Sequence, residues 1–168
     1  AGCVSAGAGV ALEKSFDRFD TLPALLVLVP AHLSSSGALG GILSGRLSSK
    51  LFLGLVAPTA RPDREARHDI SLVVLLAVPV YMANGAGAHL VARALGQASP
   101  GLCDMVVLSL IGGALAISFV VAVAYYGTIA AYRTGLDPDT YGIPVVSSSV
   151  DLVGSLTLII GIALLGLG

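Results

Sequence analysis

The chain is poor in charge and in aromatic rings. Only 11% of its 168 residues are charged, 5% are aromatic and none is tryptophan. Soluble domains carry about 25% charged residues, so this composition excludes an ordinary soluble domain. The net charge is −1 and the basic residues are scattered, which argues against a nucleic-acid-binding face. A lipid bilayer is the environment that fits this composition.

Ligands for soft metals are scarce as well. Cys3 and Cys103 form no CxxC spacing, and no paired-histidine motif occurs. This argues against a zinc, copper or iron site. Acid–base catalysis inside a membrane would need a second positioned group, and the apolar segments offer only His32 and His89. We therefore do not expect an enzyme.

Long uncharged runs are what the sequence has in abundance. Hydrophobic residues make up 55% of it, and the mean hydropathy is +0.92. Runs of about 20 apolar residues indicate transmembrane helices, because a helix satisfies its own backbone in lipid. Barrel strands would be shorter and would alternate in polarity. We predict a single all-α integral membrane domain over residues 1–168, multi-pass in the cell membrane (plasma or inner), with five helices at residues 1–14, 22–56, 69–95, 103–133 and 140–167.

Two of these five segments are unusual. Residues 1–14 are too short to span a bilayer, so we expect a truncated first helix. The second segment exceeds a hydrocarbon core of about 30 Å and contains a proline, several serines and several glycines, which disturb helices. We therefore predict a second helix that is either broken or unusually long. Three glycines spaced four apart would let another helix approach closely: Gly37, Gly41 and Gly45.

The arginines predict the orientation. The connection at residues 57–69 carries three of them, the connection at residues 132–142 carries Arg133, and the connection at residues 96–104 carries no lysine or arginine. Because cytoplasmic connections are enriched in lysine and arginine, we expect the first two on the cytoplasmic side and the end of the chain outside.

Asp151 is a lone carboxylate within the final apolar run. A charge at this depth costs about 2.5–3.5 kcal/mol and therefore needs a partner. Three explanations remain open. The carboxyl could be protonated and hydrogen-bonded to Asn84 or to serines, it could form a structural ion pair with Arg46 or Lys50, or it could bind a cation.

The ligands available around such a cation are oxygens, which suit Mg²⁺, Ca²⁺ or an alkali ion. Prolines add backbone carbonyls that lack a helical donor. One carboxylate is too few for a divalent ion, but a two-fold dimer would bring two copies of Asp151 to its axis. The candidate metal ligands are Asp151, Ser147, Ser148 and Asn84, and the candidate pore-lining residues are Ser34, Ser35, Ser36, Gly37, Ala38 and Pro144.

Two stretches resemble the MgtE family of magnesium channels and transporters, including its eukaryotic solute-carrier relatives. Residues 23–54 are similar to the second transmembrane segment of that family through Arg46-Leu47-Ser48-Ser49 and Gly54. Residues 137–165 are similar to the fifth segment through Asp137-Pro138, Pro144, Asp151 and Gly154. The resemblance implies a five-transmembrane-helix, MgtE-like domain that forms a homodimeric or pseudo-dimeric pore, in which Asp151 holds partly hydrated Mg²⁺ on the axis.

The chain departs from this family where it carries Gly37-Ala38, because the family has Gly-Asn there. Two functions follow. The first is a channel or transporter whose transported ion is Mg²⁺, working as a homodimer in the bilayer. The alternative is a non-conducting structural partner that pairs with a related chain.

Overall fold

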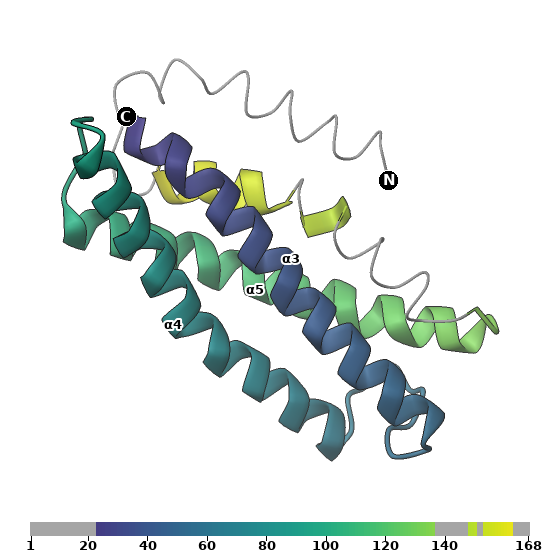
Figure 1. Ribbon diagram of the computed structural model, residues 1–168. Helices are drawn as coiled ribbons and strands as arrows, with labels where there is room; N and C mark the ends of the chain where they lie inside the picture. Colours follow the sequence, from purple (N-terminus) through teal and green to yellow (C-terminus); the bar gives the residue numbers. More distant parts are fainter. Residues whose placement is uncertain (1–22, 137–147, 151–152, 163–168) are drawn as a thin grey trace.

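The computed structural model describes residues 23–136, 148–150 and 153–162. Three long helices account for most of them: α3 (Pro23–Phe52), α4 (Arg64–Ala94) and α5 (Leu102–Arg133). Each is long and apolar enough to cross a membrane. At 1.5 Å per residue each measures about 45–48 Å, so its ends extend beyond a hydrocarbon core of about 30 Å unless it tilts. Figure 1 shows the three helices packed along one another.

All regular structure in the described residues is helical, which confirms the all-α membrane class. The count of five helices is not confirmed. The described part of the chain contains the three long helices and a shorter apolar helix that includes residues 148–150 and 153–162. The predicted helix at residues 1–14 lies outside the described residues, as does part of the predicted helix at residues 140–167.

The bounds of α5 agree with the predicted helix to within one residue, whereas α4 begins five residues before the predicted position 69. The earlier start has a local cause in Asp63. Its carboxylate caps α4 by accepting the backbone N–H of Ala66 at 2.8 Å, and it also accepts the N–H of Ala57 at 2.9 Å. Burial alone would raise the pKa of Asp63, but these amide donors outweigh it and hold the pKa below its usual range.

The helix α3 is long and unbroken, so the predicted alternative of a broken second helix is wrong. Pro30 and the serine- and glycine-rich turns after it are all helical. Proline removes one backbone donor, and the neighbouring helix compensates nearby because the Asn84 amide donates to the carbonyl of Ala31 at 3.3 Å. In lipid an unwound turn would leave still more backbone groups without partners, which favours the continuous helix.

The helices enclose two apolar clusters with a polar layer between them. One cluster lies toward the end of α3 near Phe52 and the other toward its beginning near Pro23. The second cluster also contains Leu158 and Ile162, so the final short helix packs against the first half of α3. The polar layer holds buried side chains from all three long helices: His32, Ser36, Tyr81 and Ser109.

Two glycines allow α4 and α5 to approach closely, and neither belongs to the predicted strip. A Cβ added to Gly85 would lie 2.6 Å from the carbonyl oxygen of Met105, and one added to Gly113 would lie 2.3 Å from Cδ2 of Tyr81. By contrast, a Cβ added at any glycine of the predicted strip would meet no described atom within 4 Å. Within the described chain, the strip therefore faces no close neighbour.

The connection between α3 and α4 is held against the end of α5. The Tyr125 hydroxyl donates to the carbonyl of Thr59 at 3.0 Å, and the Arg133 guanidinium donates to the carbonyl of Pro58 at 2.8 Å. The two arginine-bearing connections of the sequence therefore lie at the same end of the helices, as the orientation argument requires. Which side of the membrane that end faces stays a prediction.

Candidate functional site

The structure divides the predicted site residues between a buried polar layer and an uncovered helix face. Asn84 and Ser35 belong to the first group. The Asn84 amide donates to Ser35 Oγ at 2.9 Å and to the carbonyl of Ala31 at 3.3 Å. These bonds join α4 to α3, so Asn84 acts as a contact between helices. Such bonds contribute about 1 kcal/mol in membranes.

Ser36 lies deeper in the same layer and is fully buried. Its Oγ donates to the carbonyl of His32 at 2.8 Å and lies 2.7 Å from the Tyr81 hydroxyl. Because the single Ser36 proton is used on the His32 carbonyl, the Tyr81 hydroxyl is left to donate to Ser36. On the far side, Ser109 Oγ donates to the carbonyl of Tyr81 at 2.7 Å. This chain of bonds links α3, α4 and α5 at one level.

The side chain of His32 completes the layer and was not among the predicted site residues. It is fully buried, and its ring lies 5.0 Å from the ring of Tyr81. Gly112 gives it space, because an added Cβ there would lie 3.3 Å from Cε1 of His32. Within the described residues neither ring nitrogen has a hydrogen-bond partner. The sequence signal was available, since a histidine inside an apolar helix is rare.

Ser34, Gly37 and Ala38 form the second group, on a face of α3 that no described helix covers. Ser34 and Ala38 are exposed, and Gly37 is half-buried with open space where a Cβ would stand. The exposed positions recur every four residues along α3, which places them on one stripe. Its members are Leu26, Pro30, Ser34, Ala38, Ile42 and Arg46.

The remaining predicted ligands come from the end of the chain. Asp151, Ser147 and Pro144 lie outside the described residues, so their predicted roles stay predictions. Ser148 is described and half-buried. The parts of this segment that are described pack on α3: Val150 joins the cluster around Leu39 and Leu43, and Gly154 lies so close to α3 that an added Cβ would come within 2.7 Å of Leu33.

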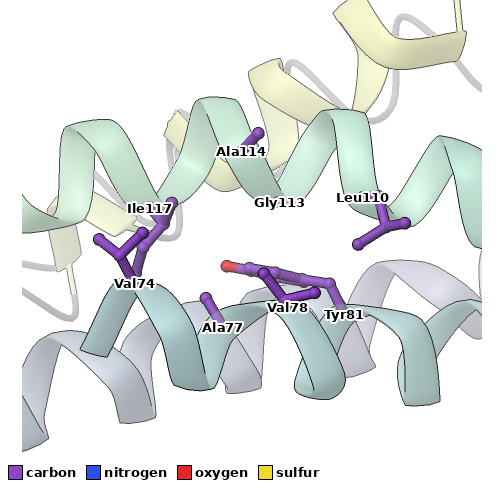
Figure 2. A pocket seen from close by; sticks show the side chains of 8 residues that line it. All are labelled: Val74, Ala77, Val78, Tyr81, Leu110, Gly113, Ala114 and Ile117. Carbon is purple, nitrogen blue, oxygen red and sulfur yellow. The ribbon is translucent and has the colours of Figure 1, made fainter. Parts of the chain in front are cut away.

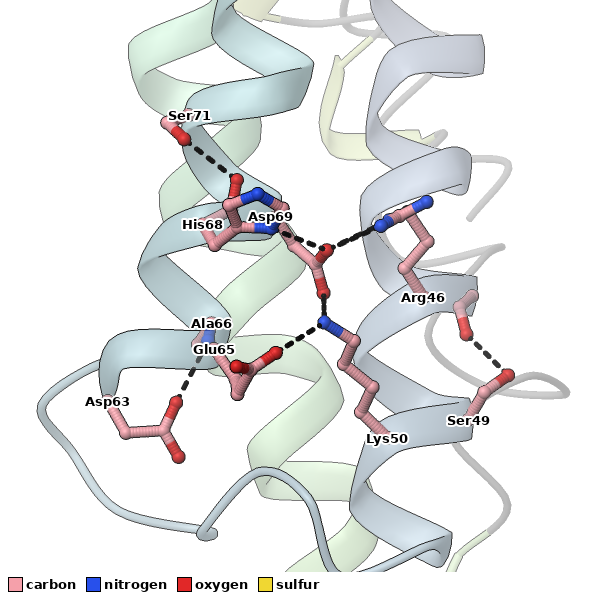
Figure 3. A network of polar contacts seen from close by, with 10 residues as sticks. Arg46, Ser49, Lys50, Asp63, Glu65, Ala66, His68, Asp69 and Ser71 are labelled. Atoms are coloured by element: carbon pink, nitrogen blue, oxygen red, sulfur yellow. Dashed lines mark hydrogen bonds and ion pairs between the residues drawn. The ribbon is translucent and has the colours of Figure 1, made fainter.

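An ion-pair network joins the other ends of α3 and α4, and the sequence reasoning missed it (Figure 3). The fully buried carboxylate of Asp69 contacts Arg46 at 2.7 Å and Lys50 at 2.9 Å. Lys50 also contacts Glu65 at 3.1 Å. The two cations are four residues apart and so are the two carboxylates, which is the spacing of one helix face. That pattern could have predicted the pairing.

This network bears on the open explanations for Asp151. Arg46 and Lys50 were its candidate counter-charges, and both already contact carboxylates of α4. The described residues contain no group of three or more histidine, cysteine, aspartate or glutamate side chains that could hold a metal ion. Any cation site in this molecule therefore depends on oxygens from other sources, such as a second copy of the chain.

Long apolar helices, buried polar side chains between them and a polar stripe on α3 define an α-helical membrane protein with the features of a transport protein. The family profile of MgtE, described as a divalent cation transporter, matches residues 29–161. This covers most of the chain, including α4, α5 and nearly all of α3. The chain belongs to the MgtE family of divalent cation transporters. No curated protein and no solved structure matches it.

Proposed function

We propose that this chain is a magnesium channel or transporter in which two copies form a pore across the cell membrane, and in which Asp151 of each copy holds partly hydrated Mg²⁺ near the axis. Membership of a divalent cation transporter family supports the substrate class. The observation that carries the dimeric arrangement is the uncovered stripe on α3, defined above.

The stripe has the chemistry of a surface that faces protein and water rather than lipid alone. Ser34 is exposed in the middle third of α3, and no described hydrogen bond engages its hydroxyl. In hydrocarbon a polar group without a partner is costly. Beside it, Gly37, Gly41 and Gly45 leave open space where side chains would stand. A second copy packed against these glycines would bring its backbone close and shield the hydroxyls from lipid.

The chemistry of Mg²⁺ explains why two copies are needed. Magnesium keeps several waters and is usually held by one or two carboxylates, and each copy supplies one acidic residue in its final helix. An ion pair within the chain is disfavoured, because α4 already supplies carboxylates to Arg46 and Lys50. A bound cation remains the explanation of Asp151 that also accounts for its cost in the membrane.

A substitution at Gly41 tests the dimer. Gly41→Ile places a large side chain on the stripe where the described chain has open space, so each copy should fold as before. We expect dimer cross-linking to fall strongly and Mg²⁺ transport to fall with it. Gly127→Ile in α5, another glycine with open space around it, is the matched control and should leave dimers intact. Equal cross-linking in both variants would contradict a dimer through α3.

Thiol labelling tests whether the stripe faces water. In a background with both native cysteines replaced by serine, Ser34→Cys should react with a charged, membrane-impermeant thiol reagent, and the reaction should block transport. Leu75→Cys is the control, because Leu75 is 70% exposed on α4 and should face lipid. The proposed pore would be refuted if the introduced thiols of the two variants were equally unreactive while the wild-type protein transported Mg²⁺.

The second candidate function is a non-conducting partner subunit, and Ala38 favours it. Ala38 is exposed on the stripe at the position where the resemblance leads us to expect an asparagine. A methyl group cannot supply the amide oxygen or the N–H donors that an asparagine would offer to an ion's water shell. This function predicts intact dimers that do not transport Mg²⁺ alone.

A further inference from the structure

A continuous apolar groove runs along the seam between α4 and α5, on a side of the molecule that the proposed pore does not use. Its deeper part encloses about 300 Å³ and its outer part about 210 Å³. The lining residues of α5 follow one another at spacings of three and four, so the two parts lie end to end on one face. We call this the α4–α5 groove; α4 and its preceding connection contribute Pro62, Ile70, Val74, Ala77, Val78 and Tyr81, and α5 contributes Leu110, Gly113, Ala114, Ile117, Ser118, Val121, Ala122, Tyr125 and Tyr126.

The deep end of the groove is closed and almost purely apolar. Figure 2 shows the ring of Tyr81 lying between α4 and α5 as one wall of this space. Its hydroxyl is bonded to Ser36 on α3, so the groove receives the ring and little polar surface. Gly113 opposite cannot carry a side chain without meeting that ring. An apolar occupant without hydrogen-bonding groups is what this end accepts.

The outer end is basic. Arg61 adjoins the lining residue Pro62, and Arg67 lies one turn before the lining residue Ile70, with Arg64 between them. All three arginines are exposed, and none forms an ion pair in the part of the chain that the structure describes.

The nearby carboxylates are already engaged. Asp69 and Glu65 contact the cations of α3, and Asp63 accepts backbone N–H groups. The guanidinium groups at the mouth of the groove are therefore left without a neutralising anion from α4 itself. Guanidinium is the side chain best suited to phosphate.

The length of the groove matches one leaflet. From Ile70 to Tyr81 the helix advances 11 residues, about 16 Å, which is half of a hydrocarbon core of about 30 Å. From this geometry we propose that the α4–α5 groove binds one anionic phospholipid, with an acyl chain along the seam and its phosphate at Arg61, Arg64 and Arg67. Basic pockets between transmembrane helices recognise lipid headgroups in this way.

The absence of tryptophan from the chain makes a site-specific test possible. Tyr126→Trp places a single fluorophore in the outer groove, where Tyr126 is 55% exposed. Leu72→Trp is the control at a similar depth on α4, exposed and outside the groove lining. Each variant is reconstituted in bilayers that contain increasing fractions of brominated phosphatidylglycerol or brominated phosphatidylcholine, and quenching gives the relative affinity for the two lipids.

We expect the fluorophore of Tyr126→Trp to prefer phosphatidylglycerol by about fivefold, the factor for one basic side chain near an anionic lipid, while that of Leu72→Trp shows a preference close to one. Replacing the three arginines with glutamine should remove the preference, and replacing them with lysine should restore part of it. A single Arg67→Gln change serves if the triple variant does not fold. Equal preferences in the two tryptophan variants would overturn the proposal. So would a groove fluorophore that neither lipid quenches, because that result would mean that protein covers the groove.

Discussion

The close approach of α4 and α5 at Gly113 makes a quantitative prediction through a matched pair of substitutions. Gly113→Ala and Gly127→Ala make the same change in the same helix. A Cβ at position 113 would lie 2.3 and 2.4 Å from Cδ2 and Cγ of Tyr81, whereas a Cβ at position 127 would meet no described atom within 4 Å. The ring cannot easily turn away, because its hydroxyl is bonded to Ser36 and its backbone carbonyl to Ser109.

The expected energies follow from these contacts. Alanine in place of glycine favours a helix by up to about 1 kcal/mol, and Gly127→Ala should gain most of this. Overpacking a buried site costs about 1–3 kcal/mol, so Gly113→Ala should lose more than it gains. The two variants should therefore differ by about 2–3 kcal/mol in unfolding free energy, measured by titrating the detergent-solubilised protein with dodecyl sulfate and following circular dichroism. Equal shifts in both variants would refute the packing of Tyr81 on Gly113.

Three further predictions concern the charged end of the helices and the stripe. Asp69→Asn should lower the unfolding free energy by about 2 kcal/mol in the same titration, because charge-assisted bonds to two cations are lost, one of them half exposed to solvent; an unchanged midpoint would contradict the network. Asp63→Ala should cost about 1 kcal/mol at neutral pH, and since the folded pKa of Asp63 lies below the usual value of about 3.9, this difference should persist above that value and vanish as pH falls through the folded pKa; a difference that grows on acidification would have the wrong sign. Ala38→Asn should raise Mg²⁺ flux in proteoliposomes if the missing amide limits conduction, and an unchanged flux would show that it does not.

The positions of the helices were predictable because the thickness of a bilayer sets their length. The bounds of α5 were predicted to within one residue from the uncharged run alone. The continuity of α3 was not predictable by the same reasoning, because proline and glycine break helices most readily where water can satisfy the exposed backbone. At membrane depth there is no such water, and α3 continues through Pro30.

The fine structure of the site was less accessible to sequence reasoning. A strip such as Gly37, Gly41 and Gly45 has the same local pattern whether it packs inside one chain or between chains, and only the fold shows that the close contacts within the chain are made by Gly85 and Gly113 instead. Asn84 was open to two interpretations, and its bonds to Ser35 and Ala31 make it a contact between helices. These outcomes depend on which faces meet, which periodicity alone does not determine.

The measurement that tests the central claim most directly is Mg²⁺ uptake into proteoliposomes that contain only this chain, with Asp151→Asn prepared in parallel. The proposed pore predicts uptake by the wild type and none by the variant, while both still cross-link as dimers. Transport by Asp151→Asn at the wild-type rate would contradict the proposed role of Asp151. Intact dimers of the wild type that take up no Mg²⁺ would contradict a self-sufficient pore and favour the partner subunit.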